Sequence, residues 1–462
     1  MTRIVVVGGG IAGLSTAWAV RWRDPSAHLL VLERGARTGG NIRTEYVDGY
    51  TCEGGPDGFL DNAPDTLRLV RQIGLERRLL PSQDAARKRY IFRKGRLHQV
   101  PLSPHDMITS RLLSAVGKLR LLCEPFSRRP SDSDESIHDF AARHIGEEAA
   151  SVLVESMVSG IFAGDAHALS LRACFPKMWE MESRYGSLVR AMIATRRQRK
   201  ATDTPGGPAG TLTSFVTGMT ELVDALTAAL AESVRTGTRV LNVRRDPETD
   251  GWSVLTTAGH LEADVVILAG PAAESSEFLR TFDPRLAREL DDIPTAPVAV
   301  LALGYDAASV GPLDGFGFLV PRCEGIRTLG ALWETSIYPN RAPEGKALLR
   351  VILGGARDRE AVTLSDEELL QIVRQDLETT MGLTAVPAFV KITRHPRGIP
   401  QYERGHLARL ARIDALAAMH RGLFLAGNSY RGVSMNSCIA EADRIAEAAL
   451  ASAVPARLAL AG

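Results

Sequence analysis

The chain has 462 residues, more than one hydrophobic core usually supports, so its length predicts two or three domains. Apolar residues make up 45% and charged residues 24%, as in ordinary soluble proteins, and the formal net charge of +1 excludes a nucleic-acid binder driven by bulk electrostatics. The five cysteines show no metal-ligand spacing, so we expect no metal and a reducing compartment. No apolar run approaches the ~18 residues of a membrane span, and a strand begins at once without a signal peptide. These features predict a cytoplasmic protein, at most peripheral on the inner face of the membrane.

The first elements of the chain have the order of a dinucleotide-binding unit. A buried parallel strand is expected at Ile4–Val7, followed by a glycine turn, a helix over Ala12–Arg21 and a second strand at His28–Leu32. The glycines follow G-x-G-x-x-G spacing, which allows a tight turn, close approach of the backbone to a pyrophosphate and close packing of the helix on the strand. Glu33 ends the second strand, where an acid takes the ribose hydroxyls.

A second run of residues distinguishes FAD from NAD. Arg34, Arg37, Gly39, Gly40 and Arg43 form R-x-x-x-x-G-G-x-x-R, and Glu53-Gly54-Gly55-Pro56 follows shortly after. This arrangement resembles the extended FAD signature of amine-oxidase-like flavoproteins. FAD is therefore the predicted cofactor.

The middle of the chain reads as helical. An amphipathic helix is expected over 65–80 and a hairpin around Lys94-Gly95, with further helices at 107–122, 136–144, 147–158 and 175–199. The loops between them are predicted at 130–134, 160–165 and 201–210. One helical segment carries apolar residues among basic ones, which fits either core packing or contact with anionic lipid, and we favour the core; these residues are Leu112, Leu113, Val116, Leu119, Leu121 and Leu122.

Strand patterns return in the second half. A helix is expected at 220–231, short strands at 239–243 and 252–255, and a fully buried strand at 263–269 that completes the N-terminal sheet. An antiparallel sheet is expected from strands at 298–305, 317–321, 328–333 and 348–353, then a helix at 365–381 with a Ser365/Glu368 capping box. The last elements are a strand at 423–426 and a helix at 437–450, whose N-terminus points back at the sheet and could stabilise negative charge on a flavin.

Eight motifs together resemble the oxygen-dependent, FAD-containing protoporphyrinogen oxidases over nearly the whole chain: EGGPDGF, KRYIFRKGRLHQVP, SGIFAGD, DGFGFLVP, LGALW, RVILGGAR, GIPQY and GNSYRGVSMNSCI. The resemblance implies an α/β (α+β) fold with a Rossmann-like FAD-binding domain of the hydroxylase type, a mixed-sheet substrate domain and a helical insertion. We expect the FAD domain at 1–80, 211–290 and 396–462, the substrate domain at 81–100, 170–210 and 291–395, and the helical domain at 101–169.

The resemblance also implies site residues. Around FAD it places Gly8, Gly9, Gly10, Ile11, Ala12, Gly13, Glu33, Arg34, Gly40, Asn41, Gly55, Pro56, Asp57, Gly58, Val240, His395, Gly427, Val433, Ser434 and Met435. His395 stands at a position where the family is expected to carry an aromatic residue against the flavin. Around the substrate the resemblance places Arg89 at the propionates, Gly160 in the pocket wall, and Phe316, Leu319, Leu332 and Ile352 around the macrocycle, where ordinary sheet core is the competing interpretation.

The predicted reaction is oxidation of protoporphyrinogen IX to protoporphyrin IX in haem biosynthesis, with FAD as cofactor and oxygen as acceptor, and no catalytic acid or base is named. Oxidation of coproporphyrinogen III remains open, with Lys88, Arg93 or Arg172 as further cations, and so do an FAD-dependent amine oxidase and a non-catalytic carrier of the same fold. Lipid contact by the helical domain, handover to a ferrochelatase and homodimer formation are left undecided.

Overall fold

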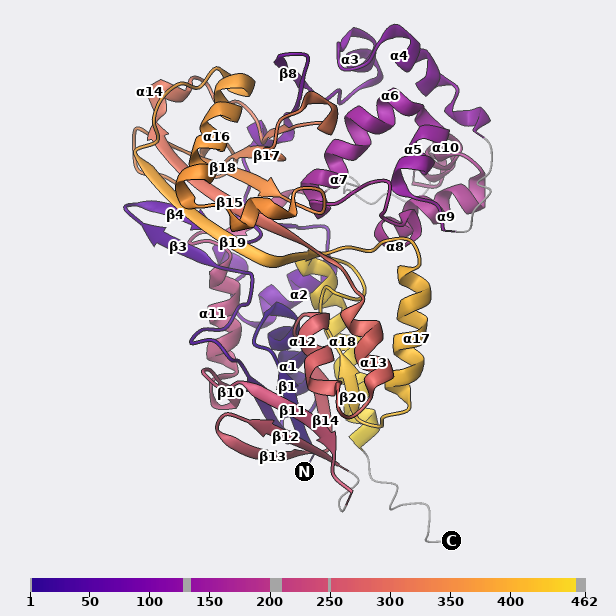
Figure 1. Ribbon diagram of the computed structural model, residues 1–462, viewed down its shortest axis with the longest axis vertical. Helices are drawn as coiled ribbons and strands as arrows, with labels where there is room; N and C mark the ends of the chain where they lie inside the picture. Colours follow the sequence, from indigo (N-terminus) through magenta and orange to yellow (C-terminus); the bar gives the residue numbers. More distant parts are fainter. Residues whose placement is uncertain (1, 128–133, 200–209, 248–250, 454–462) are drawn as a thin grey trace.

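The computed structural model describes residues 2–127, 134–199, 210–247 and 251–453 (Figure 1). Its first unit is a five-stranded parallel sheet in the order β10-β2-β1-β14-β20. The strands are β1 (Arg3–Val7), β2 (His28–Leu32), β10 (Val234–Arg235), β14 (Val265–Leu268) and β20 (Leu423–Leu425). The buried β-branched run at Ile4–Val7 forms the central strand, as predicted, and the α/β fold class is confirmed.

Two layers cover this sheet. One face packs on α1 (Ile11–Arg23), α2 (Pro64–Gln72), α11 (Thr220–Ala229) and α18 (Met435–Ala453). The other face packs on α12 (Ala272–Leu279), α13 (Pro284–Asp291), α17 (His406–Ala418) and the three-stranded sheet β11 (Val240–Arg245), β12 (Trp252–Thr256) and β13 (Gly259–Ala263). The predicted helix over 65–80 is too long: it ends at Gln72 before Gly74, and Leu79–Pro81 forms strand β6. Helices α12, α13 and α17 were not predicted.

Small sheets connect the parallel sheet to the next unit. β3 (Thr44–Val47) pairs with β4 (Tyr50–Glu53), and β9 (Leu212–Phe215) pairs with both β5 (Phe59–Leu60) and β6 (Leu79–Pro81). The small sheets carry the chain from the parallel sheet to the large mixed sheet above it in Figure 1. Short 3₁₀ turns lie at 76–78, 84–87, 124–126, 231–233, 322–324 and 359–363, and the short helix α14 lies at Ala307–Val310.

The second unit is a seven-stranded sheet in the order β19-β15-β18-β17-β16-β7-β8. Its strands are β7 (Arg89–Arg93), β8 (Arg96–Gln99), β15 (Thr295–Asp306), β16 (Gly317–Leu319), β17 (Gly330–Trp333), β18 (Lys346–Gly354) and β19 (Phe389–Pro400). The turn at Lys94-Gly95 has positive φ at both residues, as a tight hairpin requires. Helix α15 (Glu334–Ile337) follows β17, and α16 (Asp366–Met381), capped by Ser365 and Glu368 as predicted, covers one face.

The third unit is helical and divides more finely than the sequence suggested. The predicted helix at 107–122 is two helices, α3 (Pro104–Thr109) and α4 (Ala115–Leu122), because Ser103 and Ser114 each cap a new start. α5 (Ile137–Ile145) begins at the Ser136 cap, and α6 (Glu147–Ala149) runs through a π turn at 150–154 into α7 (Glu155–Phe162).

Two glycine assignments in this unit need correction. The break predicted at 160–165 starts too early, because Gly160 lies inside α7 and the helix ends where Ala163 takes a left-handed conformation. The helix predicted at 175–199 is two helices, α9 (Pro176–Tyr185) and α10 (Leu188–Arg199), with left-handed Gly186 between them, and the short helix α8 (Leu171–Cys174) precedes them. The predicted loop at 201–210 and most of that at 130–134 lie outside the described residues.

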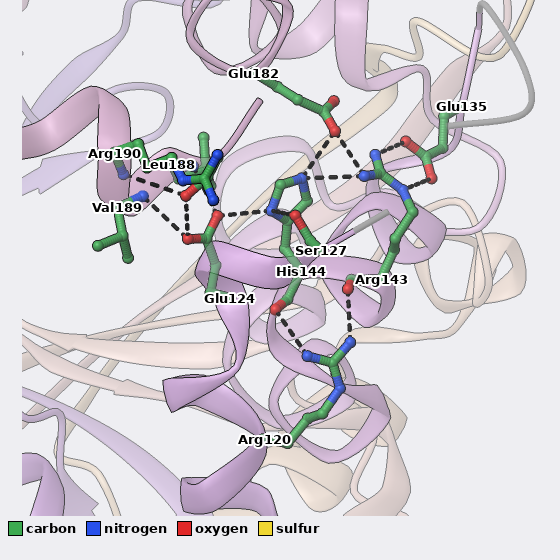
Figure 2. Close-up of polar contacts among 11 residues, drawn as sticks. Arg120, Glu124, Ser127, Glu135, Arg143, His144, Glu182, Leu188, Val189 and Arg190 are labelled. Atoms are coloured by element: carbon green, nitrogen blue, oxygen red, sulfur yellow. Dashed lines mark hydrogen bonds and ion pairs between the residues drawn. The ribbon is translucent and has the colours of Figure 1, made fainter. Parts of the chain in front are cut away.

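A buried polar network holds the helical unit together (Figure 2). The His144 ring lies 2.8 Å from Glu124 and 3.0 Å from Glu182, and Arg143 forms ion pairs with Glu182 and Glu135, both at 2.6 Å. Glu124 also accepts hydrogen bonds from the amides of Leu188 and Val189 at the start of α10. Segment 170–199, expected with the substrate domain, thus packs on α5.

Candidate active site

The glycine turn after β1 has the close backbone approaches that the sequence predicts. A Cβ on Gly13 would lie 2.0 Å from the carbonyl oxygen of Gly8, so α1 packs on the turn with no room for a side chain. Gly8 has φ +111°, which favours glycine. Glu33 accepts hydrogen bonds from the amides of Gly9 (2.8 Å) and Gly35 (2.7 Å), and its carboxylate therefore connects the turns after β1 and β2.

Three glycines leave an open floor at the N-terminus of α1. A Cβ on Gly10 would meet no atom closer than 4.0 Å, and one on Gly427 none closer than 3.8 Å, while Gly40 has φ +57° and borders Gly10. The first amides of a helix have no partner within the helix and carry its positive dipole end, so this floor suits a pyrophosphate. α1 and α18 pack together in the same core. The residues present therefore fit FAD.

The other residues predicted around FAD differ in burial and in their contacts. Ala12 is buried and Ile11 half-buried in the first turn of α1, and Met435 is buried at the start of α18. Ser434 caps α18 by accepting from Ser437 N, Val433 is half-buried, and exposed Arg34 forms an ion pair with Glu274 (2.9 Å). The side chain of Val240 is buried in the core between the parallel sheet and β11–β13.

The loop at 54–58 is fastened to the large sheet. The carbonyl oxygen of Gly54 lies 2.6 Å from Nε2 of His395, and that of Gly55 accepts a hydrogen bond from Arg350. Burial lowers the pKa of His395 below its usual value despite the Gly54 contact, so the ring is neutral and its Nε2–H donates. A Cβ on Gly55 would lie 1.9 Å from the Asn41 carbonyl oxygen, which explains the glycine. Pro56, Asp57 and Gly58 follow, all half-buried.

Strand register places the predicted substrate residues on the same sheet face as His395. Ile352 pairs with Val300 across β18–β15, and Val300 pairs with Thr393, two residues from His395. Leu332 pairs with Arg350, which is two residues from Ile352, and also with Gly317, which in turn pairs with Arg89. Leu319 is two residues from Gly317. Since side chains of paired and alternate strand residues share a face, all of these residues face the loop at 54–58.

Side chains on this face of the large sheet are more exposed to solvent than those on the face that packs against α16. Leu319, Leu332 and Ile352 are half-buried, as is Phe316, whereas the intervening Phe318 and Val351 are buried against α16. These four residues are therefore less buried than the side chains on the opposite face. Phe316 and Leu332 nevertheless pack against a small buried cluster that includes Tyr338, and Ile352 packs against one that includes Val298. All four lie on the partly exposed side of the sheet, and their assignment to the substrate stays a prediction.

Arg89 and Gly160 frame this surface. The Arg89 guanidinium lies 5.1 Å from the centre of the Phe316 ring, and the structure gives it no carboxylate partner among the described residues. A Cβ on Gly160 would lie 2.8 Å from a Leu319 methyl group, so α7 approaches β16 closely. Of the other cations considered, Lys88 pairs with Asp314 (2.5 Å), Arg93 pairs with Glu148 (3.0 Å), and Arg172 stacks on Trp179.

Arg350 and Glu334 were not among the residues predicted for the site. Arg350 interrupts the apolar run LLRVIL, and Glu334 follows LGALW at the end of β17. Both are buried, at 6% and 2% exposure, and both adjoin the loop at 54–58. A charged residue inside a buried strand was the only available signal.

A separate cluster joins the helical unit to the end of β18. His138, Glu155 and His167 each place a potential ligand atom within 4.8 Å of the others. However, the two imidazole rings stack at 3.7 Å, and Nη1 of Arg357 lies 3.9 Å from Glu155. Arg357 also pairs with Asp165. These contacts describe an ion-paired junction between α7 and the large sheet.

Comparison with known proteins agrees with this geometry. Residues 11–450 match the model of the flavin containing amine oxidoreductase family. The chain is 33% identical to a chloroplastic protoporphyrinogen oxidase of Oryza sativa subsp. japonica, covering 94% of this chain and 85% of the relative. It is 31% identical to the coproporphyrinogen III oxidase of Bacillus subtilis (strain 168), covering 94% and 95%.

A crystal structure of a provisionally assigned protoporphyrinogen oxidase from Exiguobacterium sp. 255-15 is also similar. It superposes with a TM-score of 0.83 at 29% identity, over 96% of this chain and 98% of that one. The predicted cofactor and the predicted resemblance are confirmed. The chain thus belongs to the flavin containing amine oxidoreductase family and is an FAD-dependent oxidoreductase similar to the porphyrinogen oxidases.

Proposed function

We propose that the protein oxidises protoporphyrinogen IX to protoporphyrin IX, with FAD as cofactor and oxygen as acceptor. The observation that carries this proposal is the partly exposed face of the large sheet, where Leu319, Leu332 and Ile352 lie between Arg89 and the loop at 54–58. A tetrapyrrole is a wide apolar disc with carboxylates on one edge, and it needs apolar walls and a cation at one rim. The relatives in rice and Bacillus are named for oxidation of such discs.

The roles of individual residues follow from their positions. Gly8 to Gly13, Glu33, Gly40 and Gly427 would hold the FAD pyrophosphate and ribose, and the loop at 54–58 with His395 would hold the ring. The division of the chain would place 1–80, 211–290 and 396–462 around FAD and 81–100 and 291–395 around the substrate. The bound flavin supplies the hydride acceptor. The apolar wall orients the disc and excludes water, and a pyrrole nitrogen lone pair assists hydride loss from a meso carbon.

Replacing Arg89 with alanine tests the anchor. A charge-assisted hydrogen bond contributes ~1.5–3 kcal/mol, so we expect KM for protoporphyrinogen IX to rise roughly 10- to 100-fold with kcat within about threefold of wild type. Steady-state porphyrin fluorescence measures both constants. Arg87→Ala is the matched control, since Arg87 is exposed two residues earlier and pairs only with Asp84 among its described contacts. An unchanged KM in Arg89→Ala would remove the anchoring role.

Coproporphyrinogen III is the second candidate substrate. This substrate carries four carboxylates. Lys88 precedes Arg89 in the chain, and 42% of its side chain is exposed. A substrate carboxylate could therefore reach Lys88 and replace Asp314 as its partner. Arg93 is less available, with 12% exposure and Glu148 as partner. Side-by-side kcat/KM values for the two porphyrinogens, in wild type and Lys88→Ala, decide between them. A coproporphyrinogen oxidase loses selectivity for that substrate in the variant, whereas a protoporphyrinogen oxidase keeps its preference.

We also propose peripheral membrane contact through α4. Val116, Leu119 and Leu122 are 78%, 63% and 74% exposed and lie within one stripe of the helix, near the top of Figure 1. The core interpretation favoured from the sequence is therefore wrong for these three residues and right for Leu112 and Leu113, which are buried. Lys118 and exposed Arg111 would face anionic headgroups. Within the described ranges, no helix has the length and apolarity needed to cross a bilayer.

Changing all three exposed residues of α4 to serine tests this contact. Each aliphatic side chain contributes ~1.5–3 kcal/mol when fully buried, so even partial insertion predicts at least about a tenfold loss of binding to vesicles of phosphatidylglycerol and phosphatidylcholine. Co-sedimentation measures the bound fraction. Val386→Ser with Met419→Ser is the control, because these residues are 67% and 69% exposed on other elements. Equal binding of both variants would exclude α4 as the contact.

A further inference from the structure

A buried group of charged side chains lies beneath the partly exposed sheet face, and the function proposed above gives these side chains no part in proton transfer. Its centre is Arg350, whose Nη1 lies 3.7 Å from Oδ1 of Asp57 and 3.7 Å from Oε1 of Glu334. Its other terminal nitrogen donates to the Gly55 carbonyl oxygen. One guanidinium therefore stands between two carboxylates. Glu53 and Arg341, at 3% and 0% exposure, extend the group.

Two of the three carboxylates in this group, Glu334 and Asp57, have oxygens without hydrogen-bond donors. Both oxygens of Glu334 and Oδ2 of Asp57 are buried without a hydrogen-bond partner. A buried ionised carboxylate needs donors or a close cation, and these contacts to Arg350 are too long to be hydrogen bonds. Glu53, by contrast, accepts from the Met219 amide (2.8 Å) and the Thr44 hydroxyl (2.8 Å). Glu334 and Asp57 are thus the members best suited to hold a proton.

The charge balance leads to the same conclusion. Three carboxylates and two guanidiniums leave one excess negative charge when all are ionised, and a single bound proton removes it. Burial raises the pKa of Glu334 above its usual range, the nearby Asp57 charge raises it further, and Arg350 and Arg341 oppose this. Burial likewise raises the pKa of Glu53 to about 7. Cys52 and Tyr338 also face the group, and burial raises the pKa of each, so they stay protonated at neutral pH.

The group lies close to the place where the proposed reaction would release a proton from the substrate. Arg350 shares its sheet face with Leu332 and Ile352, the proposed macrocycle wall, and Asp57 belongs to the loop proposed to hold the flavin ring. Asp57 is the partly exposed member, with 14% of its side chain accessible, while Glu334 lies behind it. The order from the proposed pocket inward is therefore Asp57, Arg350, Glu334.

We propose that Asp57, Arg350 and Glu334 form a proton-holding site for porphyrinogen oxidation; this rests on the function proposed above. In each two-electron step the porphyrinogen loses a hydride from a meso carbon and a proton from a pyrrole nitrogen. The hydride passes to the cofactor, and oxygen finally takes up that hydride and one proton to give hydrogen peroxide. Asp57 accepts the proton, and the group with Glu334 keeps it until oxygen is reduced. After three such steps, one proton moves from the remaining meso CH2 group to a pyrrole nitrogen, and this tautomerisation gives the porphyrin. Atoms and electrons balance, and no proton needs to cross to solvent.

Glu334→Gln tests the site by proton counting. This variant keeps the shape of the side chain and removes one carboxylate, and neutralising a buried acid of this kind is expected to leave the protein at least as stable. The site is empty at rest only above the pKa of Glu334, which burial raises to about 8, so the measurement is made at about pH 9. In anaerobic single-turnover mixing with protoporphyrinogen IX and a pH-indicator dye, wild type should then release less than about 0.3 proton per flavin reduced. Glu334→Gln should release about one proton, because the remaining charges balance without it. Equal release in the two proteins overturns the proposal.

A second measurement is independent of the substrate. At about pH 9 Glu334 is ionised at rest, and photoreduction of the bound flavin would place negative charge near it and raise its pKa further. The infrared difference spectrum of wild type should therefore show a protonated carboxyl band that Glu334→Gln lacks. Persistence of the band in Glu334→Gln overturns the proton-holding role, even if the protein oxidises no porphyrinogen. A different outcome overturns only the proposed function: wild type shows the carboxyl band, Glu334→Gln lacks it, and wild type does not oxidise protoporphyrinogen IX. Glu344→Gln, an exposed glutamate of the same unit, is the control and should match wild type in both measurements.

Asp57→Asn tests whether Asp57 accepts the pyrrole proton, separately from whether Glu334 holds it. If Asp57 is the group that takes the pyrrole proton, its replacement should slow flavin reduction by roughly 10²- to 10⁴-fold, as removal of a general base does. Because Asp57 belongs to the loop proposed to hold the flavin ring, flavin content per chain is measured first, and the rate is compared only for protein that carries bound flavin. A rate of flavin reduction within threefold of wild type would show that Asp57 does not accept the proton.

Discussion

Gly13→Ala should produce a protein that does not retain FAD. The added Cβ would lie 2.0 Å from the Gly8 carbonyl oxygen and 3.3 Å from the Ala269 Cβ, so α1 must move away from the turn. The amides at the start of α1 then no longer point at the pyrophosphate. We expect an affinity for FAD at least about 100-fold weaker, which corresponds to ~2.8 kcal/mol, and a colourless protein after purification. Flavin absorbance per chain and titration of the apoprotein with FAD measure the loss.

Gly10→Ala is the matched comparison. Its Cβ would meet no atom within 4.0 Å in the protein alone, so the thermal midpoint of the apoprotein should stay within about 2 °C of wild type, whereas that of Gly13→Ala should fall by about 4 °C or more. Both variants should bind FAD weakly, since Gly10 lies in the floor where the pyrophosphate passes. Full FAD content in Gly13→Ala would mean that the turn accommodates the clash and that the close approach is not required.

Glu124→Ala should loosen the helical unit around α5, α9 and α10. The 3%-exposed carboxylate binds His144, the Ser187 hydroxyl and two amides at the start of α10 (Figure 2). Its removal takes the acceptor from the hydroxyl and the two amides and leaves His144 with Glu182 and Ser127. Breaking such a network costs ~3–5 kcal/mol. Amide hydrogen exchange should show protection in these helices reduced by roughly 10²- to 10³-fold, with the parallel sheet unchanged. Glu180→Ala, an exposed glutamate of α9, should leave protection within threefold of wild type.

The same residue predicts acid sensitivity. Burial alone would raise the pKa of Glu124, but hydrogen bonds from Ser187, Leu188, His144 and Val189 together hold it below its ordinary value. Its contribution to stability is therefore fully present above the pKa of an unfolded glutamate, about 4.3, and is lost as pH falls through the lower folded value. Protection of α10 in wild type should decline below about pH 4. A decline of equal size in Glu124→Ala would assign it to another carboxylate.

Local signals predicted the parallel sheet and its glycine turn well. Ile4–Val7 is buried on both faces and continuous in its apolar pattern, and Gly8 and Gly13 occupy positions where backbone geometry permits nothing larger. By contrast, β19 was missed because its second half carries Arg394, His395 and Arg397, which look like a solvated loop. His395 and Arg397 contact the FAD unit, whereas Arg394 pairs with Asp366 at the start of α16, so neither face of this part of the strand shows an apolar pattern in the sequence.

The site was predictable where backbone geometry requires a residue, and elsewhere only through resemblance. Leu319, Leu332 and Ile352 look like core residues until pairing with Arg350 and Gly317 places them on the partly exposed face. The charges around Arg350 could not be found locally, because their partners lie about 20 and almost 300 positions away in the chain and only the fold brings them together. Exposure of Val116 and Leu119 is equally a property of the assembled helices.

The order of strands in the parallel sheet has a consequence for biosynthesis. The FAD floor begins with β1 and α1, but Gly427 and α18 come from residues 427–453, and β20 must pair with β14 before they can take their places. During most of translation, a nascent chain therefore has the glycine turn after β1 but lacks the C-terminal residues predicted to bind FAD. Flavin uptake must wait until those last segments leave the ribosome, so truncated products would remain unloaded and open to proteolysis.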